Sequence, residues 1–327
     1  MVSLPTTSPP NSVSPAPPAG PDLFDLVHRP PPAGGIRRFL YRVSRGRINP
    51  GPSRRDQARA ELVARVRTPV VAGRRRIAMI SLKGGVGKTT TTVMLGHTFA
   101  SLRGDGVIAI DANPDAGNLA SRIRRETDAT VRDFVRGQGN FPRYADVRRF
   151  TSQADSRLEV LAAEQDPALS EAFSGVDYTA ALGELERFYP LVLTDCGTGI
   201  LHDAMTAVLY YADQLVVVTQ PAIDSARALD RLLEWLDQHS YRYLVDTAIV
   251  ALNNVGRHTR QQADLFTRHF ESRCRAVVTI PHDPTLALGG ETSPDQLAAA
   301  TRRAYLRLAA AVGEGFVTPG SGNTPGP

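Results

Sequence analysis

The stretch SLKGGVGKTT, residues 81–90, holds the only two lysines of the chain, Lys83 and Lys88. The chain has 38 Lys and Arg residues in all, so the other 36 are arginine. A lysine ammonium is a compact point charge on a slender stem, and a planar guanidinium does not replace it inside a tight cradle. The composition therefore indicates that the geometry of an ammonium matters at these two positions.

The residues around the second lysine are those of a phosphate-binding loop. The loop follows an apolar run at 76–82 and opens a helical pattern, which is the context in which such a loop forms. Gly84, Gly85 and Gly87 let backbone N–H groups converge on an anion beside the positive end of a helix dipole. We expect Lys88 to reach the β- and γ-phosphates and the Thr89 hydroxyl to ligate Mg²⁺.

The motif KGGVGKTT resembles the deviant Walker A motif of the MinD/ParA family of P-loop ATPases. The resemblance implies that the cofactors are ATP and Mg²⁺. It also implies that Lys83 reaches across a homodimer to the partner's phosphates, much as an arginine finger does. The chain departs from the MinD branch at Leu82, where that branch usually has glycine. The implied nucleotide-binding loop is Gly84, Gly85, Val86, Gly87, Lys88, Thr89 and Thr90.

Two further motifs resemble the family's magnesium-binding and switch segments. LVLTDCGTG (191–199) resembles the Walker B strand and second switch, and Asp195 ends its apolar run, placed to hold Mg²⁺ through water. Gly197 and Gly199 give that loop room to respond to a γ-phosphate. IAIDANPDAGNL (108–119) resembles the first switch, in which Asp111 lies near the water shell of the metal. The implied metal site is therefore Thr89, Asp111 and Asp195.

Asn113 stands where the family usually has a second acidic residue that positions the attacking water. An amide orients water, as glutamine does in GTPases, but it does not accept a proton as a carboxylate does. We therefore expect hydrolysis to be slow or to rely on Asp115. Apart from the resemblance, DANPD is an Asx-rich turn. The implied catalytic residues are Lys83, Asp111, Asn113 and Asp195.

The resemblance also implies a base-binding region and a dimer face. Asn253 in IVALNNVGR matches the family residue that reads adenine through its amide, and Pro281 and Asp283 match the loop that packs over the base. The helical pattern at 222–239 matches a helix of the dimer face, with a solvated charged face as the alternative. The matches run in the expected order over roughly residues 75–285.

The pattern of apolar runs predicts the fold class. The runs are β-rich and almost continuously apolar, which is typical of strands buried on both faces of a parallel sheet, and helical patterns fill most of the gaps. We therefore predict a doubly wound α/β fold with a mostly parallel, seven- to eight-stranded sheet and helices on both faces. The predicted strands are 76–82, 106–111, 158–163, 190–195, 214–220, 247–253 and 276–281, and the predicted helices are 87–103, 176–188, 222–239 and 294–312.

The two ends of the chain differ from this core. Residues 1–35 contain ten prolines among small residues, so we expect a disordered segment there, and a flexible tail at 316–327. Between them, a basic arm at 36–74 precedes the ATPase-like domain at 75–315. From residue 36 to residue 76 there are 13 arginines against two acidic residues, and a short helix is expected at 54–67. Such an arm meets nucleic acid, anionic lipid or an acidic protein face, or is simply solvated.

Composition limits the class of protein. The sequence contains no run of 18 or more apolar residues, so we expect no transmembrane segment. Its N-terminus lacks the pattern of a signal peptide. Cys196 and Cys274 form no C-x-x-C pair, which favours a reducing, cytoplasmic location, with Cys196 a buried structural thiol.

Three functions remain open at this point. The first is a slow ATPase switch that recruits or positions a protein complex through the head or the arm. The Pro-rich head and basic arm make it similar to MinD-like ATPases associated with actinobacterial type VII secretion. The second is a partition-type ATPase that binds DNA non-specifically. The third is a nucleotide-binding scaffold that does not hydrolyse ATP.

Overall fold

The structure is a computed structural model that describes residues 35–45, 47–113, 117–137, 141–164, 173–198 and 203–318. The chain divides into two compact units, Met1–Ala60 and Glu61–Pro327. The expected Pro-rich segment up to residue 34 and the tail from residue 319 lie outside the described residues.

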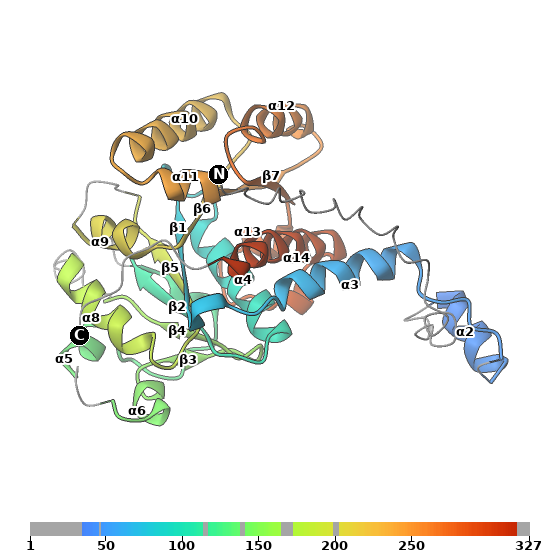
Figure 1. Cartoon of the computed structure of the whole chain (residues 1–327), viewed down its shortest axis with the longest axis horizontal. Helices are drawn as coiled ribbons and strands as arrows, with labels where there is room; N and C mark the ends of the chain where they lie inside the picture. The colour runs from blue at the N-terminus through green and yellow to red at the C-terminus, as the bar shows by residue number, and fades with distance from the viewer. Residues whose placement is uncertain are drawn as a thin grey trace, which may run out of the picture. The chain divides into compact units, whose positions relative to one another are not determined.

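One eight-stranded sheet forms the frame of the second unit (Figure 1). Its strand order is β3-β4-β2-β5-β1-β6-β7-β8, and all neighbouring strands pair in parallel except β3, which runs antiparallel to β4. The predicted fold class is therefore confirmed, and β3 is the strand that the apolar pattern did not indicate. The strands are β1 Arg75–Ile80, β2 Val107–Ala112, β3 Ser152–Gln153, β4 Leu158–Leu161, β5 Leu191–Cys196, β6 Gln214–Thr219, β7 Ile249–Val255 and β8 Ala276–Pro281.

The central strands are apolar throughout because both faces of the sheet are covered. In β1, Ile77 and Met79 belong to the core on one face, whereas Ala78 and Ile80 belong to the core on the other. All six residues of β1 are buried. Alternation between two cores, rather than between core and solvent, explains the continuous apolar runs.

Long helices cover one face of the sheet. α4 (Lys88–Leu102) and α14 (Ala299–Gly313) supply most of the helical side chains of that core, and Phe316 packs with them. α4 lies close to the sheet at Gly96, where a Cβ atom would meet Leu158 Cδ1 at 2.7 Å.

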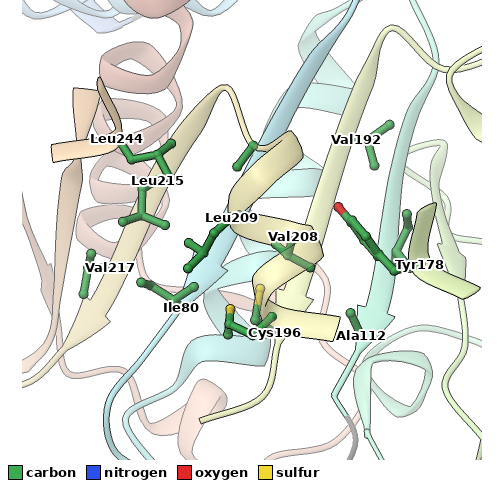
Figure 2. Packing of buried hydrophobic residues seen from close by; sticks show 14 of the residues in the cluster. Ile80, Ala112, Tyr178, Val192, Cys196, Val208, Leu209, Leu215, Val217 and Leu244 are labelled. Atoms are coloured by element: carbon green, nitrogen blue, oxygen red, sulfur yellow. The ribbon is translucent and has the colours of Figure 1, made fainter. Parts of the chain in front are cut away.

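A second set of helices covers the opposite face. Their buried side chains pack on Ile80, Val192 and Val217 of the sheet, and Figure 2 shows Tyr178, Val208 and Leu244 in this layer. α10 and α12 lie side by side, since Asp230 of α10 pairs with His269 and Arg273. The helices of this face are α5 Val131–Arg136, α6 Tyr144–Arg148, α8 Gly175–Leu185, α9 Asp203–Tyr211, α10 Ile223–Gln238, α11 Arg242–Thr247 and α12 Arg260–Phe270.

The end of the basic arm belongs to the second unit. The expected helix is present as α3 (Arg54–Val66), and its last turn buries Val66 completely in the core beside α14. Arg103 fixes the chain that follows, because its guanidinium donates to the Val66 and Thr68 carbonyls at 2.8 and 2.7 Å. The second compact unit begins at Glu61, and the start of the ATPase-like domain at residue 75 stays a prediction.

Among the residues described, none of the helices combines the length and the apolar character that a bilayer-crossing segment needs. The remaining helices of the chain are α2 Gly35–Val43, α13 Pro284–Ala287 and the 3₁₀ turns Val71–Gly73, Leu119–Arg122, Pro294–Gln296 and Glu314–Val317.

The contact between α3 and α14 predicts the effect of a single methyl group. A Cβ atom at Gly313 would meet the Arg65 carbonyl oxygen at 2.4 Å, so we expect Gly313→Ala to lower the free energy of unfolding by about 1–3 kcal/mol. In a free helix the same change would stabilise by about 1 kcal/mol. Denaturant unfolding measures the difference. Gly104→Ala is the control, because nothing lies within 4 Å of its added methyl. Wild-type stability in Gly313→Ala would contradict this packing.

Candidate functional site

A cleft of about 590 Å³ opens at the carboxyl ends of the central strands. In an open α/β sheet this edge is where ligands bind. The loop from β1 to α4 forms one wall, and residues that follow β2, β5, β7 and β8 form the others. The sequence-predicted residues that line it are Lys83, Gly84, Gly85, Val86, Gly87, Lys88, Thr89, Thr90, Asn113, Asn253, Pro281 and Asp283.

The phosphate loop depends on glycine at two positions. Gly85 and Gly87 have φ values of 74° and 88°, in the left-handed region that favours glycine. Gly87 is also the N-cap of α4, and a Cβ atom there would meet Asn253 Nδ2 at 2.8 Å. The loop therefore ends at the N-terminus of a 15-residue helix, whose dipole favours an anion at this point.

Asp195 connects the loop to the sheet. Lys88 Nζ lies 2.8 Å from its Oδ1, and the hydroxyls of Thr89 and Thr92 donate to the carboxylate at 2.6 and 3.0 Å. Asp195 is buried, and so is Lys88. The predicted lysine, hydroxyl and Walker B carboxylate are thus in direct contact.

Asp111 lies on the strand next to Asp195 and opposite it in register. Its carboxylate accepts the backbone N–H of Leu119 at 2.9 Å and of Asn113 at 3.2 Å. Burial, and next the Asp195 carboxylate, raise the pKa of Asp111 to about 7. The two buried acids face one ammonium, so a cation at this point would favour the ionised form of both.

The donor set fits Mg²⁺. Thr89, Asp111 and Asp195 offer only oxygen atoms, which are the ligands that Mg²⁺ prefers. The described residues contain no group of three or more His, Cys, Asp or Glu that could hold a metal by itself. Mg²⁺ usually keeps several waters and takes other ligands from substrate phosphates.

Lys83 lines the cleft and is partly exposed. Its ammonium pairs with the Asp224 carboxylate at the start of α10, and the two side chains are 40% and 68% exposed. The hydrogen bond from Lys83 is the main reason that the pKa of Asp224 is lowered. This pairing within one chain was not predicted from the sequence.

Asn253 holds the phosphate loop in place. Its side-chain amide donates to the Val86 carbonyl at 2.9 Å and contacts Thr91 Oγ1 at 3.0 Å. Its Oδ1 is buried without a hydrogen-bond partner among the described residues. The sequence predicted a residue that reads adenine, whereas these contacts tie the end of β7 to the loop.

Asp283 shapes the loop after β8, in which Pro281 is the last strand residue. One carboxylate oxygen accepts the N–H of Thr285 at 3.1 Å and the other accepts the N–H of Ala298 at 3.0 Å. Both oxygens thus bind backbone, and Asp283 fixes the loop that lines this side of the cleft.

The switch segments are described in part. Asn113 lines the cleft, and its N–H is held by Asp111. A Cβ atom at position 117 would meet Asp111 Oδ1 at 2.0 Å, so Gly117 is required beside this carboxylate. Asp115 and Gly199 lie outside the described residues. Cys196 is buried, and burial raises the pKa of its thiol to about 12, as a structural cysteine requires.

Sequence reasoning missed two side chains of the cleft. Arg122 is half-buried and lines the cleft from the turn after the first switch, and its Nε has no hydrogen-bond partner among the described residues. Burial lowers its pKa, against the effect of Asp195. Tyr305 reaches the same cleft from α14. No local motif marks either residue. Tyr305 is especially distant in sequence, because α14 begins more than two hundred residues after the loop.

The chain was compared with known proteins. The CobQ/CobB/MinD/ParA nucleotide binding domain family matches residues 77–292. The ESX-1 secretion-associated protein EspI of Mycobacterium tuberculosis is 38% identical over 290 residues, which are 88% of this chain and 43% of EspI. This chain therefore spans less than half the length of that relative. The septum site-determining protein MinD of Bacillus subtilis is 28% identical over 191 residues, 58% of this chain and 68% of MinD.

Solved structures bear on the fold. A ParA family ATPase from Chlorobium tepidum matches 72% of this chain and 98% of its own with a TM-score of 0.60 at 17% identity. The cell division ATPase MinD of Pyrococcus furiosus matches 73% of this chain and 98% of its own with a TM-score of 0.57 at 23% identity.

A stability measurement can distinguish two roles of Asn253, support of the phosphate loop and recognition of adenine. In the nucleotide-free protein, Asn253→Asp removes the donor to Val86 and places a carboxylate against that carbonyl. We expect the free energy of unfolding to fall by about 1–3 kcal/mol, as when a buried polar group loses its partner. Asn254→Asp is the control, because this neighbour is exposed and its φ of 58° suits aspartate. A residue that only reads adenine would leave the stability of the nucleotide-free protein unchanged and alter the preference for ATP over GTP.

Proposed function

This chain belongs to the CobQ/CobB/MinD/ParA nucleotide-binding domain family, and from that premise we propose that it is an ATP- and Mg²⁺-dependent ATPase switch. The observation that carries the proposal is the contact of Asp195 with both Lys88 and Thr89 at the N-terminus of α4. These three side chains supply the cation, hydroxyl and carboxylate that a triphosphate with its metal requires.

Each side chain has a distinct task when nucleotide binds. Lys88 exchanges the Asp195 carboxylate for phosphate oxygens, and the N–H groups from Gly84 to Thr89 bind the remaining charge. The Thr89 hydroxyl and the carboxylates of Asp195 and Asp111 would hold the metal with its water molecules. Mg²⁺, when bound, neutralises charge that develops on the transferred phosphoryl group.

A homodimer completes the proposed site. Lys83 lies at the mouth of the cleft, where a second copy could approach, and its pairing with Asp224 is largely exposed to solvent. An ion pair exposed to solvent contributes little to stability, so Lys83 exchanges this partner easily for a phosphate. The proposed dimer is thus gated by the nucleotide, because only a triphosphate supplies the new partner.

Hydrolysis in the proposed switch is slow. Asn113 lines the cleft beside Asp111, where it can orient a water molecule but cannot accept its proton. A slow intrinsic rate lets a partner control the lifetime of the dimer. We place the protein in the cytoplasm, in keeping with two free, buried cysteines, Cys196 and Cys274.

The partner is proposed to be a protein complex, recruited through the N-terminal head or the basic arm. The name of the EspI relative carries the association with secretion, and its alignment covers 88% of this chain, more than the match to MinD of Bacillus subtilis does. A secretion-associated complex therefore fits better than the septum site.

Substitution of the two lysines, Lys83 and Lys88, should have different effects. Lys88→Ala should raise the Kd for ATP about ten- to a hundred-fold, since a charge-assisted hydrogen bond contributes about 1.5–3 kcal/mol. Lys83→Ala should bind ATP as wild type does but lose ATP-dependent dimerisation and partner-stimulated turnover. Calorimetric titration gives the affinity and light scattering the mass, and each variant is the control for the other. Equal ATP affinity in wild type and Lys88→Ala would rule out this site.

The amide at position 113 predicts a gain of activity. Asn113→Asp supplies the missing carboxylate, and we expect kcat to rise about a hundred-fold, in the range of general base catalysis, with ATP affinity nearly unchanged. Steady-state phosphate release measures it. Asn254→Asp adds the same charge to another asparagine of the cleft and should leave kcat unchanged. An unchanged kcat in Asn113→Asp would show that the amide does not limit hydrolysis.

A further inference from the structure

The helix α2 (Gly35–Val43) carries an exposed apolar stripe. Ile36, Phe39, Leu40 and Val43 are 80%, 67%, 43% and 66% exposed. At about 100° per residue, their spacing places all four within an arc of about 100° on the helix. Four large apolar side chains in one exposed stripe indicate a surface that binds something apolar.

The charges around this stripe have one sign. Residues 36–55 contain seven arginines and no acidic residue. On the helix, Arg38 and Arg42 are exposed and lie outside the apolar arc, with Arg42 about 60° from its edge. The helix is thus apolar on one side and cationic beside it and behind it.

The length of α2 gives a further argument. A helix of nine residues is marginal in water, where isolated helices shorter than about 12–15 residues are rarely stable. Burial of its apolar face is what stabilises an amphipathic helix. A surface that buries the apolar stripe would therefore also stabilise the helical conformation of α2.

We propose that α2 binds along the surface of an anionic lipid bilayer. The apolar stripe enters the boundary between headgroups and acyl chains, and Arg38 and Arg42 reach the lipid phosphates, as in other basic amphipathic helices. The helix lies on the membrane and does not cross it, which agrees with its length. This inference is independent of the proposed nucleotide switch, because no residue of the cleft takes part.

Charge and apolar character together favour lipid over other anionic surfaces. Duplex DNA would use the arginines, but phosphate contacts leave no role for Ile36 and Phe39. A protein groove would suit the stripe, whereas a bilayer of anionic lipid matches both the stripe and the seven arginines without an acidic residue.

Vesicle sedimentation with the full chain tests the proposal. One set of vesicles contains phosphatidylcholine alone and the other contains phosphatidylglycerol as well. We expect binding to the anionic vesicles at least about a hundred-fold tighter, since each arginine near the surface contributes about five-fold. The double change Arg38→Gln with Arg42→Gln should weaken this binding about 25-fold. Ile36→Ser with Phe39→Ser should reduce it more than a hundred-fold, because two apolar side chains no longer leave water.

Each variant has a matched control. Arg303→Gln with Arg307→Gln removes the same charge at the same spacing on an exposed part of α14. Val176→Ser removes an apolar side chain that is 76% exposed on α8. Both should bind anionic vesicles as wild type does. The ATP affinity of every variant reports separately on the nucleotide site, so failure of one proposal is not confused with failure of the other.

Several outcomes would overturn the proposal. No binding to anionic vesicles would do so, and would favour a protein partner. Vesicle binding that survives Ile36→Ser with Phe39→Ser would show that the stripe is not used. Retention on duplex DNA that depends on the arginines but not on the stripe, in a protein that ignores vesicles, would assign the arm to nucleic acid.

Discussion

Two carboxylates buried side by side impose the main constraint on this molecule. Asp111 and Asp195 are opposite each other on adjacent strands, and Lys88 forms an ion pair with Asp195. Burial of two acids beside one ammonium leaves negative charge that the low dielectric of the interior penalises. Hydroxyls, backbone N–H groups and a helix N-terminus in the surrounding structure stabilise this negative charge. Mg²⁺ is the proposed counter-charge, because these groups offer the oxygen ligands that it prefers.

The sheet determines where this charge can exist. The central strands lie between two apolar cores, and Asp111 and Asp195 stand next to the carboxyl ends of β2 and β5. Parallel pairing brings those ends to one edge, with β1 and its loop between β5 and β6. A slip of one residue between β2 and β5 would turn one carboxylate away from the other. The register is fixed by the apolar residues of both strands, so the cores set the electrostatics of the site.

Contiguous signals in the sequence predicted most of this structure. The seven parallel strands were found because each is a continuous apolar run, and the loop from Lys83 to Thr90 because its spacing is local. The roles that were missed all depend on contacts across the fold. Asn253 reaches the loop from β7, and Asp224 meets Lys83 from α10. Short helices such as α9 and α11 carry too few turns for a clear apolar period, and tertiary packing decides them.

The contacts of the basic residues explain why the chain keeps two lysines. Arg103 uses its whole planar fork, donating to two backbone carbonyls and to both carboxylate oxygens of Asp105. An ammonium has no geometry for four such partners at once. Lys88, in contrast, makes a single ion pair with Asp195 of β5. Lys83 makes a single exposed ion pair with Asp224 of α10. In the proposed switch, a point charge with one partner transfers readily to a phosphate, whereas a guanidinium held by two carbonyls and a carboxylate does not. Arg103 therefore suits a fixed contact, and lysine suits the two positions at which the proposed mechanism exchanges the partner.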